Sequence, residues 1–464
     1  MEGHGAHAGL RVAGPQETGA PRPVFPRSAP GQPEKPRGAD FPPDGAAGKN
    51  RQAVDGRVAQ RAASPEHLGD VQPGDRFAPP RGAQTGAQAR PGFPAYRQPG
   101  NEGRRRAGGP DGGQGRGDGP DRGDEMTFSR VNFEVTTRCN LNCAHCLRDQ
   151  SGPAHDLPVE LIDRILGEAR GAYGVSLSAL TGGEPLMHPD FDGIVETLVR
   201  RDFSFSFVTN GTILPKKIPL LREPEVKKRL LNVAVSLDGP DAAAHDRIRG
   251  AGNYKKTMAG ILGLKVAGIP FVIKYTLGAH NLDRLEAAVL AASPLEAQRM
   301  EISHMHPTPD NLAAGLVASP EDWRRAEATV YRLGRELKMP VTMTSGIYSP
   351  QSFFSCASLT MVDLYVDSRG RLCLCCQLPG IRGPLPGGKE REVAASLVDA
   401  PLWDAHQKLL SVVQGFQRDR VNRIARGRLD PTDRFQCIAC ARYFGKLDWL
   451  DQHPESPWSL RRQK

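Results

Sequence analysis

The chain has 464 residues, a formal net charge of +9 and nine cysteines, and 39% of its residues are hydrophobic. Residues 1–125 hold 25 of the 51 glycines and 18 of the 40 prolines but no cysteine. This uneven composition excludes one uniform globular fold, and charges and prolines interrupt every long apolar run, which excludes a membrane span. The positive surplus is spread over the whole chain, so it does not favour nucleic acid as a partner.

The first segment, residues 1–125, is rich in Gly, Pro and Arg without a fixed repeat. It has too little apolar surface to offset the entropy of ordering, so we expect a disordered tail. Met126 lies seven residues before a strand-like run, so the tail is either a real extension or sequence upstream of the true start. No secretory signal is visible, which predicts a cytoplasmic protein with reduced cysteines.

From residue 126 onward, short β-rich runs alternate with amphipathic runs. The predicted strands are Val131–Thr136, Val175–Leu180, Ser204–Thr209, Leu231–Leu237, Pro270–Thr276 and Met300–Ser303. The predicted helices between them are Pro158–Ala169, Asp190–Arg201, Pro224–Leu230, Tyr254–Val266 and Leu282–Ala292. This α/β alternation indicates a parallel sheet with helices outside. Six β/α units in about 180 residues fit a partial (β/α)6 barrel, because a full eight-unit barrel takes about 250 residues.

A further helix and a smaller module follow the barrel units. Ser319 and Pro320 suit a helix start, and the apolar residues after them recur at helical spacing. Beyond Cys356 the pattern changes to short strands at Met361–Val366 and Arg371–Leu374, with Gly/Pro loops and six cysteines. We therefore predict a core at 126–318, a C-terminal extension at 319–450 and a C-terminal tail at 451–464.

Cys139, Cys143 and Cys146 form a C-x3-C-x2-C motif directly after the first predicted strand. Three thiolates within eight residues can bind one face of an iron–sulfur cubane and leave one iron open to a small molecule. Structural zinc prefers four ligands, usually in paired C-x2-C units, and no fourth ligand is local. The motif therefore favours a [4Fe–4S] cluster with an open iron.

This motif resembles the signature of the radical S-adenosylmethionine (radical SAM) enzymes, and further segments match that family in its order. The glycine-rich segment Thr181–Pro185 follows the second strand, Thr209–Gly211 ends the third, and Ser236–Pro240 ends the fourth, followed by His245–Arg249. The resemblance implies cofactor contacts at His145, Gly182, Gly183, Glu184, Pro185, Thr209, Asn210, Ser236, Asp238 and Arg249.

The resemblance also implies a mechanism and cofactors. Glu184 would take the ammonium group of S-adenosylmethionine, and Arg249 would pair with its carboxylate. The reduced cluster would cleave the cofactor to methionine and a 5′-deoxyadenosyl radical, which abstracts hydrogen from a substrate. The electron would come from a low-potential donor of the flavodoxin or ferredoxin kind.

The six remaining cysteines resemble the C-terminal extension called SPASM, or its shorter relative twitch. That resemblance implies one auxiliary [4Fe–4S] cluster. Its ligands would be Cys356, Cys375, Cys437 and Cys440. In a rival pairing, Cys373 and Cys376 join Cys437 and Cys440 in a C-x2-C…C-x2-C zinc pattern. Otherwise Cys373 and Cys376 are buried small residues, or one of them donates a hydrogen atom.

His304 and His306 follow the sixth predicted strand and share one face by alternation. On an inward face they could act as acid/base groups, and otherwise they are a structural pair at the barrel rim.

The family resemblance favours a peptide- or protein-modifying radical SAM enzyme. A twitch-type small-molecule dehydrogenase, or another biosynthetic enzyme, is the alternative. A non-catalytic iron–sulfur sensor or electron carrier is a remote third.

Overall fold

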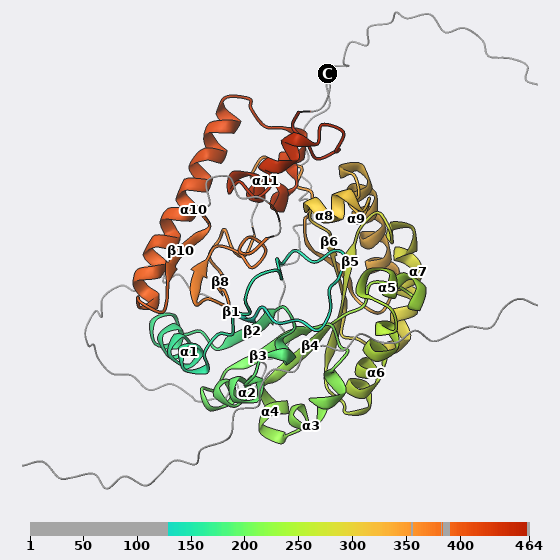
Figure 1. Ribbon diagram of the computed structural model, residues 1–464, viewed down its shortest axis with the longest axis vertical. Coiled ribbons are helices and arrows are strands. Elements are labelled where there is room, and N and C mark those ends of the chain that lie inside the picture. The colour runs from blue at the N-terminus through green and yellow to red at the C-terminus, as the bar shows by residue number, and fades with distance from the viewer. Residues whose placement is uncertain (1–128, 354–355, 382, 384–389, 462–464) are drawn as a thin grey trace, which may run out of the picture. The chain divides into compact units, whose positions relative to one another are not determined.

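The computed structural model describes residues 129–353, 356–381, 383 and 390–461 (Figure 1). The predicted tail at residues 1–125 and the candidate start at Met126 lie outside the described residues. The domain bounds stay a prediction.

A single sheet of ten strands organises the described chain, in the order β10-β9-β8-β1-β2-β3-β4-β5-β6-β7. Its strands are β1 (Arg130–Thr136), β2 (Leu177–Gly182), β3 (Ser204–Thr209), β4 (Leu230–Ser236), β5 (Phe271–Leu277), β6 (Met300–His304), β7 (Val341–Ser345), β8 (Asp363–Val366), β9 (Arg371–Cys373) and β10 (Val393–Ser396). Strands β1 to β7 are parallel to their neighbours, β8 runs parallel to β1, and β9 and β10 are antiparallel. All six predicted core strands are present within two residues of their expected bounds.

Helices follow most of the strands and lie outside them (Figure 1). They are α1 (Val159–Tyr173), α2 (Phe191–Arg200), α3 (Ile218–Leu221), α4 (Pro224–Arg229), α5 (Ala242–Arg249), α6 (Asn253–Val266), α7 (Leu285–Ala292), α8 (Pro309–Ala313), α9 (Pro320–Glu336), α10 (Leu402–Ala425) and α11 (Gln436–Tyr443). Helix α9 begins where the sequence predicts, with a capping box between Ser319 and Asp322. In the described part of the chain, no helix has both the length and the apolarity to cross a bilayer.

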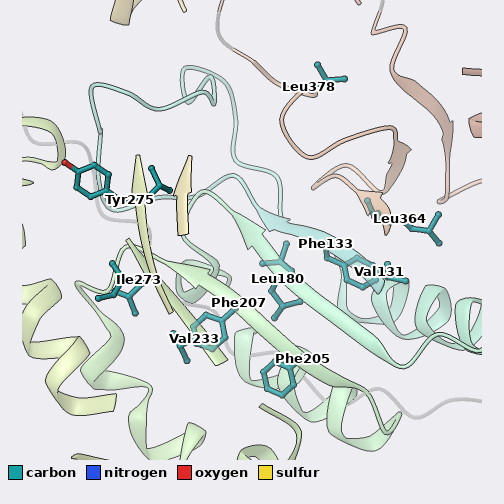
Figure 2. Packing of buried hydrophobic residues seen from close by; sticks show 14 of the residues in the cluster. Val131, Phe133, Leu180, Phe205, Phe207, Val233, Ile273, Tyr275, Leu364 and Leu378 are labelled. Atoms are coloured by element: carbon teal, nitrogen blue, oxygen red, sulfur yellow. The ribbon is translucent and has the colours of Figure 1, made fainter. Parts of the chain in front are cut away.

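The two faces of the sheet differ in chemistry. On β1, Val131, Phe133 and Val135 belong to the apolar core under the helices, and Figure 2 shows Phe133 packed with Leu180 of β2. Residues that alternate with these point to the opposite, inner face, where Glu134 of β1 is paired in register with Thr181 of β2. The inner face is therefore available for a polar site.

The C-terminal module continues the sheet through β8, whose Asp363 pairs in register with Arg130 of β1. The predicted strand at Met361–Val366 is shorter than expected, because Met361 has a positive φ of 55° and occupies a turn. Residues after 450 also contribute to the core. Trp458 is fully buried, and its indole Nε1 donates a 2.8 Å hydrogen bond to the carbonyl of Ala318.

Candidate iron–sulfur and S-adenosylmethionine site

Three motif cysteines line one small cavity at the carboxyl end of the parallel strands. The loop that carries Cys139, Cys143 and Cys146 follows β1, and its cavity of about 100 Å³ also reaches β2, β3, β4 and α5. The cavity is lined by Cys139, Leu141, Cys143, His145, Cys146, Gln150, Thr181, Gly182, Gly183, Val208, Thr209, Asn210, Ser236 and Arg249. Segments far apart in the sequence therefore meet at the edge where parallel sheets usually build sites.

Gly182 and Gly183 let β2 approach the cysteine loop closely. A Cβ on Gly182 would lie 2.3 Å from the carbonyl oxygen of Thr136, and one on Gly183 would lie 2.3 Å from that of Arg138. Because no side chain intervenes, two backbone hydrogen bonds join the end of β2 to the start of the cysteine loop. The Gly183 N–H donates to Thr136 O at 2.8 Å, and the Glu184 N–H donates to Arg138 O at 2.7 Å. A side chain at either glycine would displace the start of the cysteine loop.

Glu184 holds the end of β3 beside the cavity. Its carboxylate accepts hydrogen bonds from the Thr209 hydroxyl at 2.8 Å, the Asn210 backbone N–H at 2.7 Å and the Leu186 backbone N–H at 3.3 Å. Complete burial raises the pKa of Glu184 to about 7 in spite of these donors. A cation placed beside this carboxylate would favour its ionised form, and Thr209 and Asn210 themselves line the cavity.

Arg249, at the end of α5, brings a guanidinium to the cavity. Its Nε donates to the carboxylate of Asp238 at 2.6 Å, while Nη1 lies 4.0 Å from the Cys143 sulfur and Nη2 lies 3.4 Å from His145 Nε2. Asp238 is fully buried behind the cavity. Burial alone would raise its pKa, but the Arg249 guanidinium lowers the pKa to about 2. The outer part of the guanidinium therefore faces the cysteines as a fixed positive charge.

The residues around this cavity fit an iron–sulfur cluster. Burial raises the pKa of the Cys139 thiol and raises that of Cys143 to about 11, so these sulfurs need a metal to be held as thiolates. Burial lowers the pKa of His145 to about 4, and its Nδ1 has no hydrogen-bond partner among the described residues. Three thiols, one cation and an unpaired ring nitrogen thus surround the same space.

Nowhere in the described ranges do three or more His, Cys, Asp or Glu side chains converge on a position for a single metal ion. A cubane does not require such convergence, because each of its cysteine ligands binds a different iron.

Arg148 connects this loop to the second group of cysteines. Its guanidinium forms an ion pair with Glu134 of β1 at 3.1 Å and donates hydrogen bonds to the carbonyls of Cys376 and Pro379. The Asp149 backbone N–H donates to the carbonyl of Gly380 at 3.0 Å. The two cysteine-bearing segments are therefore joined directly, although 228 residues separate Arg148 from Cys376.

In the second group of cysteines, Cys437 interacts electrostatically with Cys356, Cys375, Cys376 and Cys440. Burial raises the pKa of Cys437 to about 12, with further increases from Cys356 and Cys376, and burial followed by Cys437 and Cys356 raises the pKa of Cys440. A hydrogen bond from the Cys375 thiol lowers the pKa of Cys376 to about 7. The four predicted auxiliary ligands thus lie together, with Cys376 beside them.

Cys373 is oriented differently from its neighbours. It is 1% exposed, and its thiol donates to the carbonyl of Arg371 at 3.4 Å. Burial first, and then the carboxylate of Asp367, raises its pKa. Whether Cys373 or Cys376 binds metal stays a prediction.

His304 and His306 lie outside the cysteine-lined cavity. His304 belongs to the outer face of β6, where its ring stacks on Trp323 of α9 at 4.0 Å and its Nε2 lies 3.5 Å from Glu327 Oε1. His306 lies 6.2 Å from the same indole. Burial lowers the pKa of both rings. Their placement fits a structural pair, and a catalytic role for them stays a prediction.

Several residues in or beside the cavity carry no motif that singles them out in the sequence. Gln150 donates to the Cys146 sulfur at 3.8 Å, and Val208 reaches the cavity from the inner face of β3. Asn140 accepts a 2.9 Å hydrogen bond from Asn210, which ties the cysteine loop to β3. Only the alternation along β3 could have indicated Val208 beforehand.

The fold and this site define an α/β protein whose parallel sheet presents a three-cysteine loop beside a glycine-lined cofactor cavity. Residues 133–291 match the family model of the Radical SAM superfamily. This segment, which includes the cysteine loop and every residue that lines the cavity, is identified as a radical SAM domain.

Relatives match the chain over part of its length. An AdoMet-dependent heme synthase of Methanosarcina barkeri is 32% identical over 218 residues, which cover 46% of this chain and 61% of the relative. A PqqA peptide cyclase of Ruegeria pomeroyi is 30% identical over 174 residues, which cover 37% of this chain and 45% of the relative. The crystal structure of Streptococcus suis SuiB bound to S-adenosylmethionine aligns with a TM-score of 0.48 and 15% identity, covering 60% of this chain and 65% of that one. The chain spans about half to three fifths of the curated relatives' length.

Proposed function

We propose that the chain is a radical SAM enzyme that abstracts a hydrogen atom from a peptide or protein substrate. One observation carries the proposal: Cys139, Cys143, Cys146 and Arg249 line the same cavity as the Gly182–Gly183 pair. A [4Fe–4S] cluster with an open iron, when bound and reduced, supplies the electron that splits S-adenosylmethionine into methionine and a 5′-deoxyadenosyl radical.

The residues of the chain hold the cofactor in place for that step. The three cysteines hold the cluster, and the Nη groups of Arg249 bind the cofactor carboxylate, since Asp238 already occupies Nε. The buried Glu184 carboxylate attracts the cofactor ammonium and keeps Asn210 at the cavity edge. Gly182 and Gly183 let β2 pack against the start of the cysteine loop, which fixes the cluster ligands beside the cofactor cavity.

The second group of cysteines holds an auxiliary [4Fe–4S] cluster. Its proposed ligands are Cys356, Cys375, Cys437 and Cys440, and Cys437 interacts electrostatically with each of the other three. Arg148 joins the two cysteine segments, so the two proposed clusters are held on directly connected parts of the chain. The one-electron donor for the first cluster is a low-potential flavodoxin- or ferredoxin-like protein.

A first experiment counts metal and product together. The full chain, reconstituted anaerobically, is expected to hold about eight iron, falling to about four when Cys139, Cys143 and Cys146 are replaced by Ala. With dithionite and S-adenosylmethionine, the wild-type chain should form 5′-deoxyadenosine and the triple variant none. An iron-loaded wild-type chain without this product would contradict the enzyme assignment and favour a sensor or electron carrier.

We propose a peptide substrate because one relative of this chain is named PqqA peptide cyclase. A second candidate, a small-molecule biosynthetic enzyme, is favoured by the relative named AdoMet-dependent heme synthase. To separate them, a fully deuterated cell extract is split by size into a peptide fraction and a small-molecule fraction. The fraction that transfers deuterium into 5′-deoxyadenosine contains the substrate, and transfer from the small-molecule fraction alone would refute the peptide assignment.

A further inference from the structure

A buried ion pair in the C-terminal module takes no part in the proposed chemistry. Lys446 Nζ lies 2.6 Å from Glu392 Oε1, and both side chains are 0% exposed. Burial of a lysine and a glutamate is costly, and well-packed apolar residues often replace such a pair without loss of stability. The pair therefore calls for an explanation other than stability.

The pair joins the two halves of the auxiliary ligand set. The Leu374 backbone N–H, next to Cys375, donates to the carbonyl of Glu392 at 2.9 Å. The Lys446 backbone N–H donates at 2.8 Å to the carbonyl of Ala441, which follows Cys440 in α11. One partner is thus fixed to the Cys375 segment and the other to the Cys440 segment.

The ion pair lies beside the segments that carry the proposed ligands. Val393, which follows Glu392, pairs in register with Cys373 of β9, and Lys446 follows α11, which carries Cys437 and Cys440. The charge of Glu392 is therefore held next to the strand that leads to Cys375 and joined to the helix that carries Cys440. Glu390 and Arg371, two further charges of this module, form their own ion pair.

The reduction potential of an iron–sulfur cluster depends on net charge, on hydrogen bonds to its sulfurs and on solvent exposure. A negative charge beside a ligand sulfur lowers the potential, because the added electron meets it in a medium of low dielectric constant. The ammonium of Lys446, 2.6 Å from the Glu392 carboxylate, compensates part of its charge.

We propose that the Glu392–Lys446 ion pair sets the reduction potential of the auxiliary cluster, with the Glu392 carboxylate holding it low. This assignment rests on the proposed function, since it requires that cluster. Both residues act through the ligands and are positioning residues.

The test uses the full chain with Cys139, Cys143 and Cys146 replaced by Ala, so that only the auxiliary cluster contributes to the measured signal. Iron and sulfide are counted first, and the potential is then measured by dithionite titration followed by electron paramagnetic resonance. Glu392→Gln leaves the Lys446 charge uncompensated and should favour reduction at least tenfold, a rise of about 59 mV. The matched control, Glu336→Gln on the exposed side of α9, should leave the potential unchanged.

The outcomes separate the two proposals. Absence of iron in the background variant overturns the auxiliary cluster itself. A cluster whose potential is unchanged by Glu392→Gln overturns the present inference alone. If Glu392→Gln loses its iron, the double variant Glu392→Gln/Lys446→Met, which leaves no lone buried charge, decides instead. It should show a smaller rise in potential, because loss of the ammonium offsets part of the loss of the carboxylate. Loss of iron from both variants, while the control keeps it, overturns the inference in favour of a structural clamp.

Discussion

Replacing Asp238 by Asn removes the charge that compensates Arg249 in the protein interior. Asp238 is fully buried, and it accepts hydrogen bonds from Arg249 Nε at 2.6 Å and from the Thr276 backbone N–H at 2.7 Å. Its pKa falls from an ordinary 3.8 to about 2, which corresponds to about 2 kcal/mol of folding free energy. Leaving Arg249 buried without a counter-charge raises the expected loss to about 3–5 kcal/mol.

Urea unfolding of the cluster-free full chain, followed by circular dichroism, measures this loss at pH 7. Replacing both partners, as Asp238→Asn/Arg249→Met, should cost less than the sum of the two single changes, because no lone charge stays buried. Glu336→Gln, an exposed carboxylate, is the control and should change the free energy of unfolding by less than about 0.5 kcal/mol.

The pH dependence has a definite sign. A carboxylate whose folded pKa lies below its unfolded pKa contributes its full stability above about pH 4 and loses it as the pH falls through about 2. The cost of Asp238→Asn should therefore be equal at pH 7 and pH 5. A cost below about 1 kcal/mol, or one that already declines between these two values, would refute the reasoning.

Three further predictions concern the core, the glycine contact and the outer histidine. Trp458→Ala should lower the free energy of unfolding in urea by about 3–5 kcal/mol, because the side chain is fully buried. Its control, Trp403→Ala at an exposed position, should lower it by about 1 kcal/mol or less. Equal losses would contradict the packing of Trp458 in the core. Gly183→Ala should displace the cysteine loop and reduce iron from about eight to about four per chain, whereas Gly171→Ala, with open space around it, should keep all of it. His304→Phe should retain 5′-deoxyadenosine formation within about threefold, and a loss of about a hundredfold with normal iron would place His304 in the catalytic machinery.

Alternation and strand-end motifs account for what the sequence predicts well. Phe133 and Glu134 fall on opposite faces of β1, as the period of two requires, and the motif residues Asn210 and Ser236 lie where parallel strands end. Because the carboxyl ends of parallel strands share one edge, consecutive motifs meet in space. The cavity was therefore predictable without any knowledge of distances.

Contacts between distant segments were not predictable in this way. The hydrogen bond from Arg148 to Cys376 depends on the pairing of β1 with β8, and nothing local in either segment encodes that pairing. Helix α10 was missed although Ala405, Leu409 and Phe416 are buried at helical spacing, because its arginine-rich second half resembles a loop in composition. The outward direction of His304 likewise depends on the tertiary position of α9.

The position of β1 has a consequence for synthesis of the chain. β1 is among the first strands to leave the ribosome, yet its partner β8 begins 233 residues later, at Asp363 opposite Arg130. Until then one edge of an apolar strand has no partner, and closing so long a loop is slow. Such an open edge invites pairing with other chains. A nascent or truncated chain that ends before β8 should therefore aggregate.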